Sequence, residues 1–144
     1  MFVTKILAGK AHQGVLTIDP GASISDAVAE LSARRIGALV VSSDGRRAEG
    51  ILSERDIVRE LGKSGDGVLG QKVSELMTSE IQTCAPNDRS EGVLQSMTEG
   101  RFRHMPVVED GLLIGLISLG DVVKARLSEV SMEKEALEAM ISGQ

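Results

Sequence analysis

The chain has 144 residues, a formal net charge of −5, 42% hydrophobic residues and only two aromatic residues, Phe2 and Phe102. At this length and composition we expect a globular chain with a sizeable core rather than a disordered one. The acidic charge and the absence of Trp and Tyr disfavour nucleic-acid binding, because phosphates need cations and single strands stack on aromatic rings. No apolar run is long enough to cross a membrane or to act as a signal peptide, so we expect no membrane attachment.

Cysteine and histidine are scarce. Cys84 is the only cysteine, which forbids an internal disulfide, and His12 and His104 are the only histidines. A zinc cluster built from Cys and His therefore cannot be assembled, and we expect no metal. This residue mix suits a reducing compartment, so the expected location is the cytoplasm.

The sequence contains an internal repeat. Residues 17–58 align with residues 83–123 once one residue is deleted after the second Asp-Gly pair, and residues 3–7 align more loosely with residues 73–77. An ordered set of matches of this kind indicates a duplicated unit. The coincident positions are Thr17/Thr83, Pro20/Pro86, Arg35/Arg101, Val41/Val107, Asp44/Asp110, Gly45/Gly111, Gly50/Gly115, Ser53/Ser118, Asp56/Asp121 and Val58/Val123.

Each copy predicts the same order of elements: strand, helix, strand, strand, helix. A proline ends the first strand, a capping box starts the first helix, and an Asp-Gly pair joins the next two strands into a hairpin. In the first copy we expect a strand over 15–18, a helix after Ser23, strands over 38–41 and from Gly50, and a helix from about Asp56. In the second we expect a strand over 81–84, a helix after Asp88, strands over 105–108 and from Gly115, and a helix from about Asp121.

The glycine-rich stretch 62–70 lies between the copies and is interpreted as a linker. The chain is therefore divided into a first repeat with its N-terminal segment and linker (1–70), a second repeat (71–127) and a C-terminal helical tail (128–144). One copy offers a three-stranded sheet with helices on one face, which is too little to bury itself alone. We predict an α+β fold in which two β-α-β-β-α repeats pack about a pseudo-twofold axis and leave two clefts.

The sequence Ser-x-x-Asp recurs at the junction between the last strand and the last helix of each copy, at Ser53-Asp56 and Ser118-Asp121. One interpretation is a capping box, in which hydroxyl and carboxylate satisfy free N–H groups of the first helical turn. The other is a nucleotide site, because a carboxylate can accept from both hydroxyls of a ribose while the helix N-terminus favours a phosphate. The junction by itself leaves both interpretations open, and it favours capping.

Basic residues cluster before one apolar strand of the second copy. Arg103 and His104 could donate charge-assisted hydrogen bonds to a phosphate, or could simply be solvated side chains at a strand entry. The first copy has Gly37 and Ala38 at the equivalent place, so the two clefts cannot be chemically equal.

The whole pattern resembles the cystathionine β-synthase (CBS) domain, in two copies over about residues 3–127. The motifs that carry the likeness are Ile-Gly-Ala-Leu-Val-Val (36–41), Arg-His-Met-Pro-Val-Val (103–108), and Gly-h-h-Ser-x-x-Asp after each hairpin, where h is apolar. The resemblance implies a tandem pair, or Bateman module, that binds adenosine-containing ligands in its clefts. AMP is the first choice, with ADP, ATP, NAD(H) or S-adenosylmethionine as alternatives, and the pair would regulate another protein that the sequence does not name.

The resemblance also assigns residues to the sites. It gives the ribose to Asp56 and Asp121 with Ser53 and Ser118 beside them, and the phosphates to Arg103 and His104 with Arg55 as a further candidate. The walls around the adenine would be Val15, Leu16, Ile36, Gly37, Ala38, Ile81, Gln82, Met105 and Pro106. Each site would be composite, because the aspartate of one copy would face the adenine walls of the other copy.

Two other functions compete with a nucleotide sensor. An enzyme is weakly supported, because the sequence has no nucleophile elbow, phosphate-binding loop or metal-ligand cluster, and no catalytic cofactor is expected. A ligand-free dimerisation module is the main alternative. The helices at 56–61 and 121–127 carry more apolar residues than one buried stripe needs, which predicts a homodimer: Ile57, Val58, Leu61, Val122, Val123 and Leu127. The acidic tail is expected to pack on the module or on its partner copy.

Overall fold

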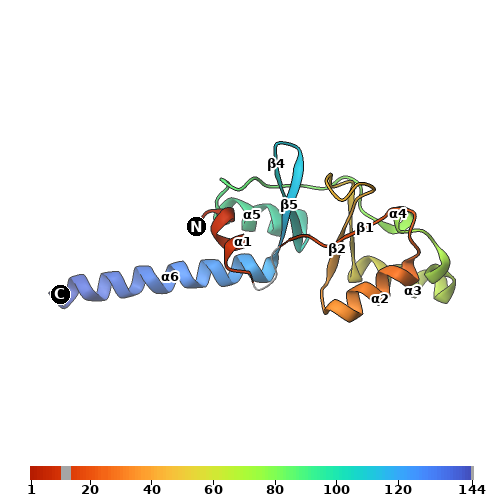
Figure 1. Cartoon of the computed structure of the whole chain (residues 1–144). Coiled ribbons are helices and arrows are strands. Elements are labelled where there is room, and N and C mark those ends of the chain that lie inside the picture. The colour runs from red at the N-terminus through yellow and green to blue at the C-terminus, as the bar shows by residue number, and fades with distance from the viewer. Residues whose placement is uncertain (11–13, 144) are drawn as a thin grey trace.

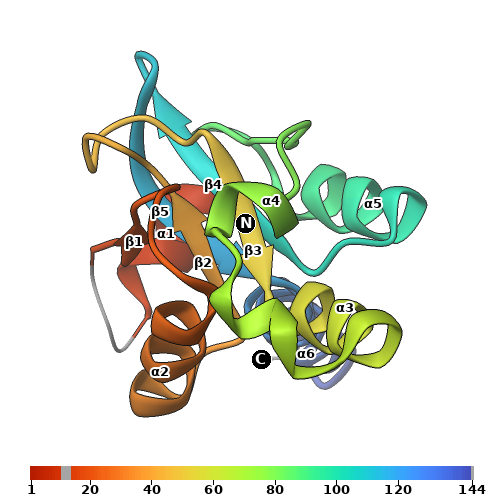
Figure 2. The same cartoon turned by 90° about the vertical axis from the view of Figure 1, so that its right-hand side faces the viewer.

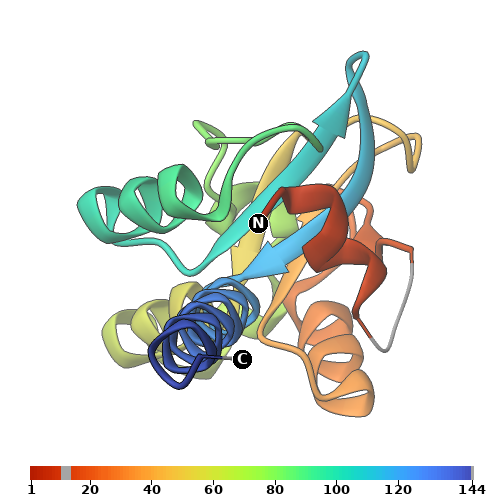
Figure 3. The same ribbon diagram turned by 90° about the vertical axis from the view of Figure 1, so that its left-hand side faces the viewer.

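The computed structural model of the chain describes residues 1–10 and 14–143, so His12 lies outside the described residues. The two repeats form two lobes side by side, and a long C-terminal helix projects from the second lobe (Figure 1). Viewed along that helix, α5 lies on one side of the strands and α2 on the other (Figures 2 and 3). The architecture is the predicted α+β pair of repeats.

The first lobe contains a three-stranded sheet in the order β1-β2-β3, with β1 parallel and β3 antiparallel to β2. Ser23 caps α2 as predicted, since its hydroxyl accepts a hydrogen bond from Asp26 N at 3.0 Å. The described elements up to this lobe's last helix are α1 (Val3–Ala8), β1 (Thr17–Ile18), α2 (Ile24–Arg34), β2 (Ala38–Val41), β3 (Gly50–Ser53) and α3 (Glu54–Ser64).

The second lobe repeats this order with differences. It contains α5 (Ser90–Gly100), β4 (His104–Glu109), β5 (Leu112–Ser118) and α6 (Leu119–Ile141), whereas η1 (Gly65–Gly70) and α4 (Val73–Leu76), which precede them in the chain, pack on the first lobe. Asp110 and Gly111, both with positive φ, form the predicted two-residue turn between β4 and β5. The predicted cap at Asp88 is wrong: α5 starts at Ser90 without a side-chain cap, and Asp88 instead accepts from Ala85 N at 2.8 Å.

The strand predicted over 81–84 is not formed. Only Cys84 pairs, through an isolated parallel bridge in which Cys84 N donates to Pro106 O and Val108 N donates to Cys84 O. The next hydrogen bond of this ladder would need an N–H at Pro106, which proline lacks. The first repeat has Val40 there and keeps a short β1. The second sheet therefore has two strands, β4 and β5.

Residues 62–70, interpreted as a linker between the copies, have regular structure. Helix α3 continues to Ser64 and the single 3-10 turn η1 follows directly. Val68 within that turn is 1% exposed and belongs to the core of the first lobe. Leu69 is partly buried against the same core, so two adjacent apolar side chains dock this stretch.

Each lobe completes its core with a helix from the segment that precedes the other repeat. Val3 and Ile6 of α1 are buried with Val93 and Ile117 of the second lobe, and Val73 of α4 is buried in the first lobe. The same exchange brings Leu7 against Gly115 and Met77 against Gly50, two glycines at equivalent positions. The lobes are therefore interlocked rather than merely adjacent.

The surplus of apolar residues on the last helix of each repeat is smaller than predicted. Ile57 and Val122 are 4% and 0% exposed and belong to the two cores. Val58, Val123 and Leu127 stay exposed, at 66%, 40% and 66%. The tail is not a separate helix, because α6 runs without a break through residue 128 to Ile141.

Candidate functional site

Asp56 lies at the β3–α3 junction, where the predicted capping box is formed. Ser53 Oγ accepts from Asp56 N at 3.3 Å, and Asp56 Oδ2 accepts from both the N–H and the hydroxyl of Ser53 at 3.0 Å. Asp56 Oδ1 pairs with the Arg59 guanidinium at 2.8 Å. The carboxylate is thus part of the helix start, is only 8% exposed and already has a cation beside it.

Asp121 is placed in the same way at the β5–α6 junction. Ser118 Oγ accepts from Asp121 N at 3.1 Å, and Asp121 Oδ2 accepts from Ser118 N at 2.9 Å. Lys10 donates to the same Oδ2 at 2.7 Å and to Leu116 O at 2.8 Å. Burial alone raises the pKa of Asp121, but the hydrogen bonds from Lys10 and Ser118 outweigh it and hold the pKa below its ordinary value. The carboxylate is charged at neutral pH.

Both boxes confirm the capping interpretation without deciding against a ribose. A carboxylate has about four lone-pair positions, so one that caps a helix can still accept from a sugar hydroxyl if its cation moves. The two sites differ in access. The side chain of Asp121 is 26% exposed, against 12% for Asp56.

His104 lies where the two repeats meet. It begins β4 and pairs in register with Ser118, and a Cβ added to Gly37 of the first repeat would lie 3.4 Å from its Cε1. Burial and the charge of Lys10 lower the pKa of His104, while the carboxylates of Asp121 and Glu54 oppose part of this change. Charged side chains from both parts of the chain, Lys10, Asp121 and Glu54, thus act on the imidazole of His104.

The repeat symmetry also positions the residues beside each box. Glu54 N donates to Gly37 O at 2.9 Å, and Leu119 N donates to Arg103 O at 2.7 Å, so Gly37 and Arg103 occupy equivalent places. Ala38 pairs with Ser53 as His104 pairs with Ser118. Gly37 and Ala38 are therefore adjacent to the Ser53 box, and Arg103 and His104 to the Ser118 box.

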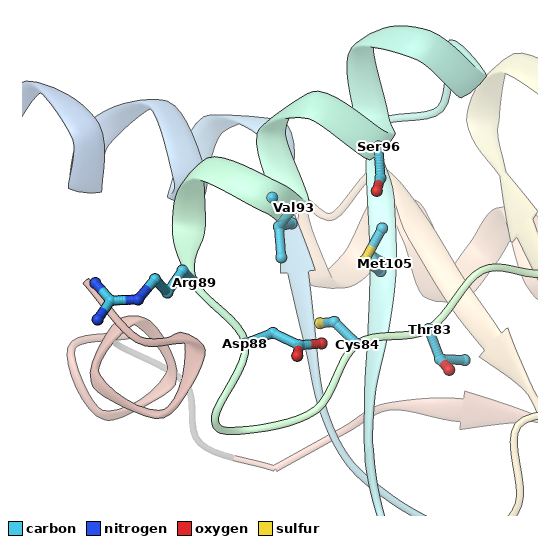
Figure 4. A pocket seen from close by; sticks show the side chains of 8 residues that line it. Thr83, Cys84, Asp88, Arg89, Val93, Ser96 and Met105 are labelled. Carbon is cyan, nitrogen blue, oxygen red and sulfur yellow. The ribbon is translucent and has the colours of Figure 1, made fainter.

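A hollow of about 270 Å³ opens beside α5 (Figure 4). Met105, which belongs to the predicted adenine wall, lines this hollow, and Val93 and Ser96 face it from α5. Thr83 and Cys84 also line it, and they directly follow the predicted wall residues Ile81 and Gln82. A second hollow, of about 460 Å³, lies on α3 and includes the predicted Arg55 together with Glu54, Val58 and Arg59. Neither hollow is lined by Asp56 or Asp121 themselves.

The remaining predicted residues have mixed environments. Ala38, Met105 and Pro106 are buried in the strands, which makes them core residues whatever else they touch. Ile36, Val15 and Ile81 are half-buried, and Leu16, Gln82 and Arg103 are exposed. The half-buried and exposed members could contact a ligand without disturbing the core.

Sequence reasoning missed three charged residues of the site. Arg59 stands three positions after Asp56, a spacing at which helical side chains meet, so the signal was present. Lys10 contacts Asp121 across 111 positions, and no local pattern reveals such a contact. Glu54 follows Ser53 in the first turn of α3, where an acidic residue is expected merely for the helix dipole.

Within residues 1–10 and 14–143 no group of three or more His, Cys, Asp or Glu side chains could hold a metal ion. In the same part of the chain, no helix combines the length and the apolarity that crossing a membrane requires.

Comparison with known proteins decides the family. The model of the CBS domain matches residues 10–63 and again residues 73–128. The chain belongs to the CBS-domain family. It is 37% identical over 125 residues to the mitochondrial CBS domain-containing protein CBSX3 of Arabidopsis thaliana, a match that covers 84% of this chain and 61% of that relative.

Solved CBS structures have the same fold. The CBS-domain containing protein ATU1752 from Agrobacterium tumefaciens is 43% identical, with a TM-score of 0.83 over 88% of this chain and 99% of that one. The CBS domain pair of protein MJ0100, solved in complex with 5-methylthioadenosine and S-adenosyl-L-methionine, is 21% identical, with a TM-score of 0.78 over 90% of this chain and 98% of that one. At that identity the second match concerns the fold alone.

Proposed function

We propose that this CBS pair is a regulatory module that binds an adenosine-containing ligand between its repeats and controls a partner protein in trans. AMP is the first candidate, and ADP, ATP, NAD(H) and S-adenosylmethionine are the others. The observation that carries the proposal is the pair of strand-to-helix junctions, each with an aspartate held by a serine at a helix N-terminus. Asp121 is ionised there, and Asp56 is nearly buried. The ligands of the MJ0100 pair support it, because both contain a ribose.

The proposed chemistry assigns one role to each side chain. The ribose hydroxyls donate to the carboxylate of Asp121 or Asp56. At Asp56 this requires Arg59 to give up part of its contact, whereas at Asp121 the described contacts with Lys10 and Ser118 both use Oδ2. The displaced cation is then free to donate to a phosphate of the same ligand, as are Arg103 and His104 near the Asp121 box. No residue is assigned a catalytic role, since binding and release are sufficient for regulation.

A ligand-free scaffold is the second candidate function, and one observation favours it. In the free chain both oxygens of Asp56 accept hydrogen bonds, from Ser53 and Arg59, and Oδ2 of Asp121 accepts from Lys10 and Ser118. If these contacts persist in solution in the presence of nucleotides, the boxes serve only the fold.

Isothermal titration calorimetry with AMP, adenosine and 2′-deoxy-AMP separates the two functions. Asn can still accept from the N–H of the capping serine but offers one acceptor oxygen and no charge, so Asp121→Asn and Asp56→Asn should each weaken AMP binding at their own site by roughly 1–3 kcal/mol. The deoxy nucleotide should reproduce this loss on the unmodified protein. If both variants bind AMP with unchanged affinity and the unmodified protein does not prefer AMP over 2′-deoxy-AMP, the ligand-free scaffold is the function that remains.

The chain supplies a matched control. Asp26 occupies the same position after a capping serine, Ser23, at the start of α2, but belongs to no predicted site. Asp26→Asn should therefore leave AMP affinity unchanged. Thermal denaturation followed by circular dichroism gives a second readout, because a ligand at 100 times its dissociation constant adds about 2.7 kcal/mol to the free energy of unfolding.

The proposed module works as a homodimer in a reducing compartment such as the cytoplasm. A dimer is supported by the apolar side chains that stay exposed on the last helix of each repeat, Val58, Val123 and Leu127. The compartment is supported by the use of a single, buried cysteine.

A further inference from the structure

The second half of α6 has no packing partner among residues 1–10 and 14–143, which the structure describes. The first half packs on the second lobe through Val122 and Ala125, which are 0% and 7% exposed, and through Glu129, which pairs with the N-terminal amine of Met1 at 2.8 Å. Beyond this point the helix extends clear of the body (Figure 1). An isolated helical segment of this length is marginal in water, so its apolar side chains call for a contact.

Those apolar side chains form one seam. Its members are separated alternately by four and three residues, the heptad spacing of a coiled coil, and the single polar member is Lys134. Every apolar member is exposed: Val123 at 40%, Leu127 at 66%, Val130 at 52%, Leu137 at 58% and Ile141 at 86%.

The seam starts on the side of α6 that faces away from the body. In the heptad register that puts Leu127 and Val130 at the two seam positions, the residues that face the body, Val122, Ala125 and Glu129, lie on the other side of the helix. A second helix can therefore lie along the whole seam from residue 123 to residue 141 without displacing α6 from the lobe.

We infer that the seam is covered by the same seam of a second copy of this chain, with the two helices antiparallel. This deepens the homodimer proposed above, since it names the surface that joins the copies. In the antiparallel pair Leu127 meets Leu137 of the second copy, Val130 meets Lys134, and Val123 meets Ile141.

Charge complementarity favours a second copy of this chain in the antiparallel direction. In a parallel pair Lys134 would face Lys134 of the second copy, and Glu133 would face Glu138 on both flanks, which places like charges at every ionic contact. In the antiparallel pair Lys124 faces Glu138 of the second copy twice. The one like-charge contact, between the two Glu133 side chains at the centre, has a Lys134 beside it in each copy.

The test measures the dissociation constant of the full-length dimer by sedimentation equilibrium. Leu137→Glu buries a charge in the seam and should raise the dissociation constant at least about a hundredfold. Met132→Glu is the matched control, because Met132 is 58% exposed on the same helix but faces away from the seam. This variant should keep the constant of the unmodified chain.

The direction is tested by charge exchange and by cross-linking. Lys124→Glu and Glu138→Lys should each weaken the dimer, and the double variant should restore it. Ser131→Cys should give disulfide-linked dimers, because the two Ser131 side chains lie together near the centre of the antiparallel pair, whereas Ile141→Cys should not.

The outcomes separate this inference from the homodimer itself. A dimer that Leu137→Glu and Met132→Glu affect equally would overturn the seam and keep the homodimer. Linked dimers from Ile141→Cys alone would overturn the antiparallel direction. A monomer at all concentrations would overturn both, including the case in which vesicles or another protein bind the exposed seam.

Discussion

His104 couples the junction between the repeats to pH. The folded chain lowers its pKa below the ordinary value of 6.5, so the folded state keeps the imidazole neutral where the unfolded chain already takes up a proton. The contribution of His104 to stability is therefore present above about pH 6.5 and is lost as the pH falls below it.

This predicts a steeper loss of stability on acidification in the unmodified chain than in His104→Gln. Urea unfolding at pH 7.5 and pH 5.5 measures the difference, since Gln does not titrate. An equal loss in the two proteins would show that His104 is not shielded from solvent in the folded state.

Burial also protects the thiol of Cys84 from reaction. Burial, with a smaller contribution from the charge of Asp88, raises the pKa of its thiol to about 12. Only the thiolate reacts quickly with alkylating reagents, so Cys84 should resist iodoacetamide in the native protein at pH 8 and react once urea unfolds the chain. Mass spectrometry of the two samples measures this, and rapid native labelling would contradict the buried position.

Single residues show where sequence reasoning stops. The pairing of Ser53 with Asp56 and of Ser118 with Asp121 could be predicted, because a capping box is a local pattern. The cation on Asp121 could not, since Lys10 and Asp121 meet only after both repeats are assembled.

At the scale of the elements, two equivalent glycines allow the exchanged segments to approach the strands. A Cβ at Gly50 would lie 2.7 Å from Met77 Sδ and 2.9 Å from the main-chain Thr78 O. A Cβ at Gly115 would meet only the tip of Leu7, with the nearest atom at 2.6 Å. A side-chain tip can rotate away, whereas a main-chain oxygen in a bridge cannot.

Gly50→Ala should therefore destabilise the protein by about 1–3 kcal/mol, and Gly115→Ala by less. Urea unfolding followed by circular dichroism gives both values. Gly62→Ala is the control, because Gly62 lies in α3 with open space around it and alanine should add up to about 1 kcal/mol of helix stability. Equal costs at Gly50 and Gly115 would mean that the Thr78 main chain yields as easily as a side chain.

The order of the elements could be predicted from the duplication, and the errors have local causes. The missing strand over 81–84 follows from the absent N–H of Pro106. The docking of residues 62–70 follows from two adjacent apolar side chains, Val68 and Leu69, that a glycine-rich composition conceals. In both places one or two residues outweighed the average tendency of their neighbours.

At the scale of the whole molecule, the exchange of α1 and α4 should make the two lobes unfold together. Ile6→Ala removes a side chain that is 7% exposed from the core of the second lobe and should cost about 2–4 kcal/mol. The loss should appear as a single shifted transition for the entire chain. Circular dichroism and calorimetry are the suitable methods, because the chain has no Trp or Tyr to report by fluorescence. Two separate transitions, with only one shifted, would show that the lobes are independent.

The exchanged helices also determine the order in which the chain can fold while it is being made. Helix α1 leaves the ribosome before nearly everything it packs against, since its buried partners Val93, Ile117 and Val122 are synthesised near the other end. At roughly 5–20 residues per second it waits for several seconds with Val3 and Ile6 uncovered. The first lobe needs only α4 to close, so it can be complete while α1 still awaits its partners. Nascent chains arrested at a length at which residues 1–80 have just left the ribosomal exit tunnel should therefore protect the first lobe from protease and leave α1 open to cleavage.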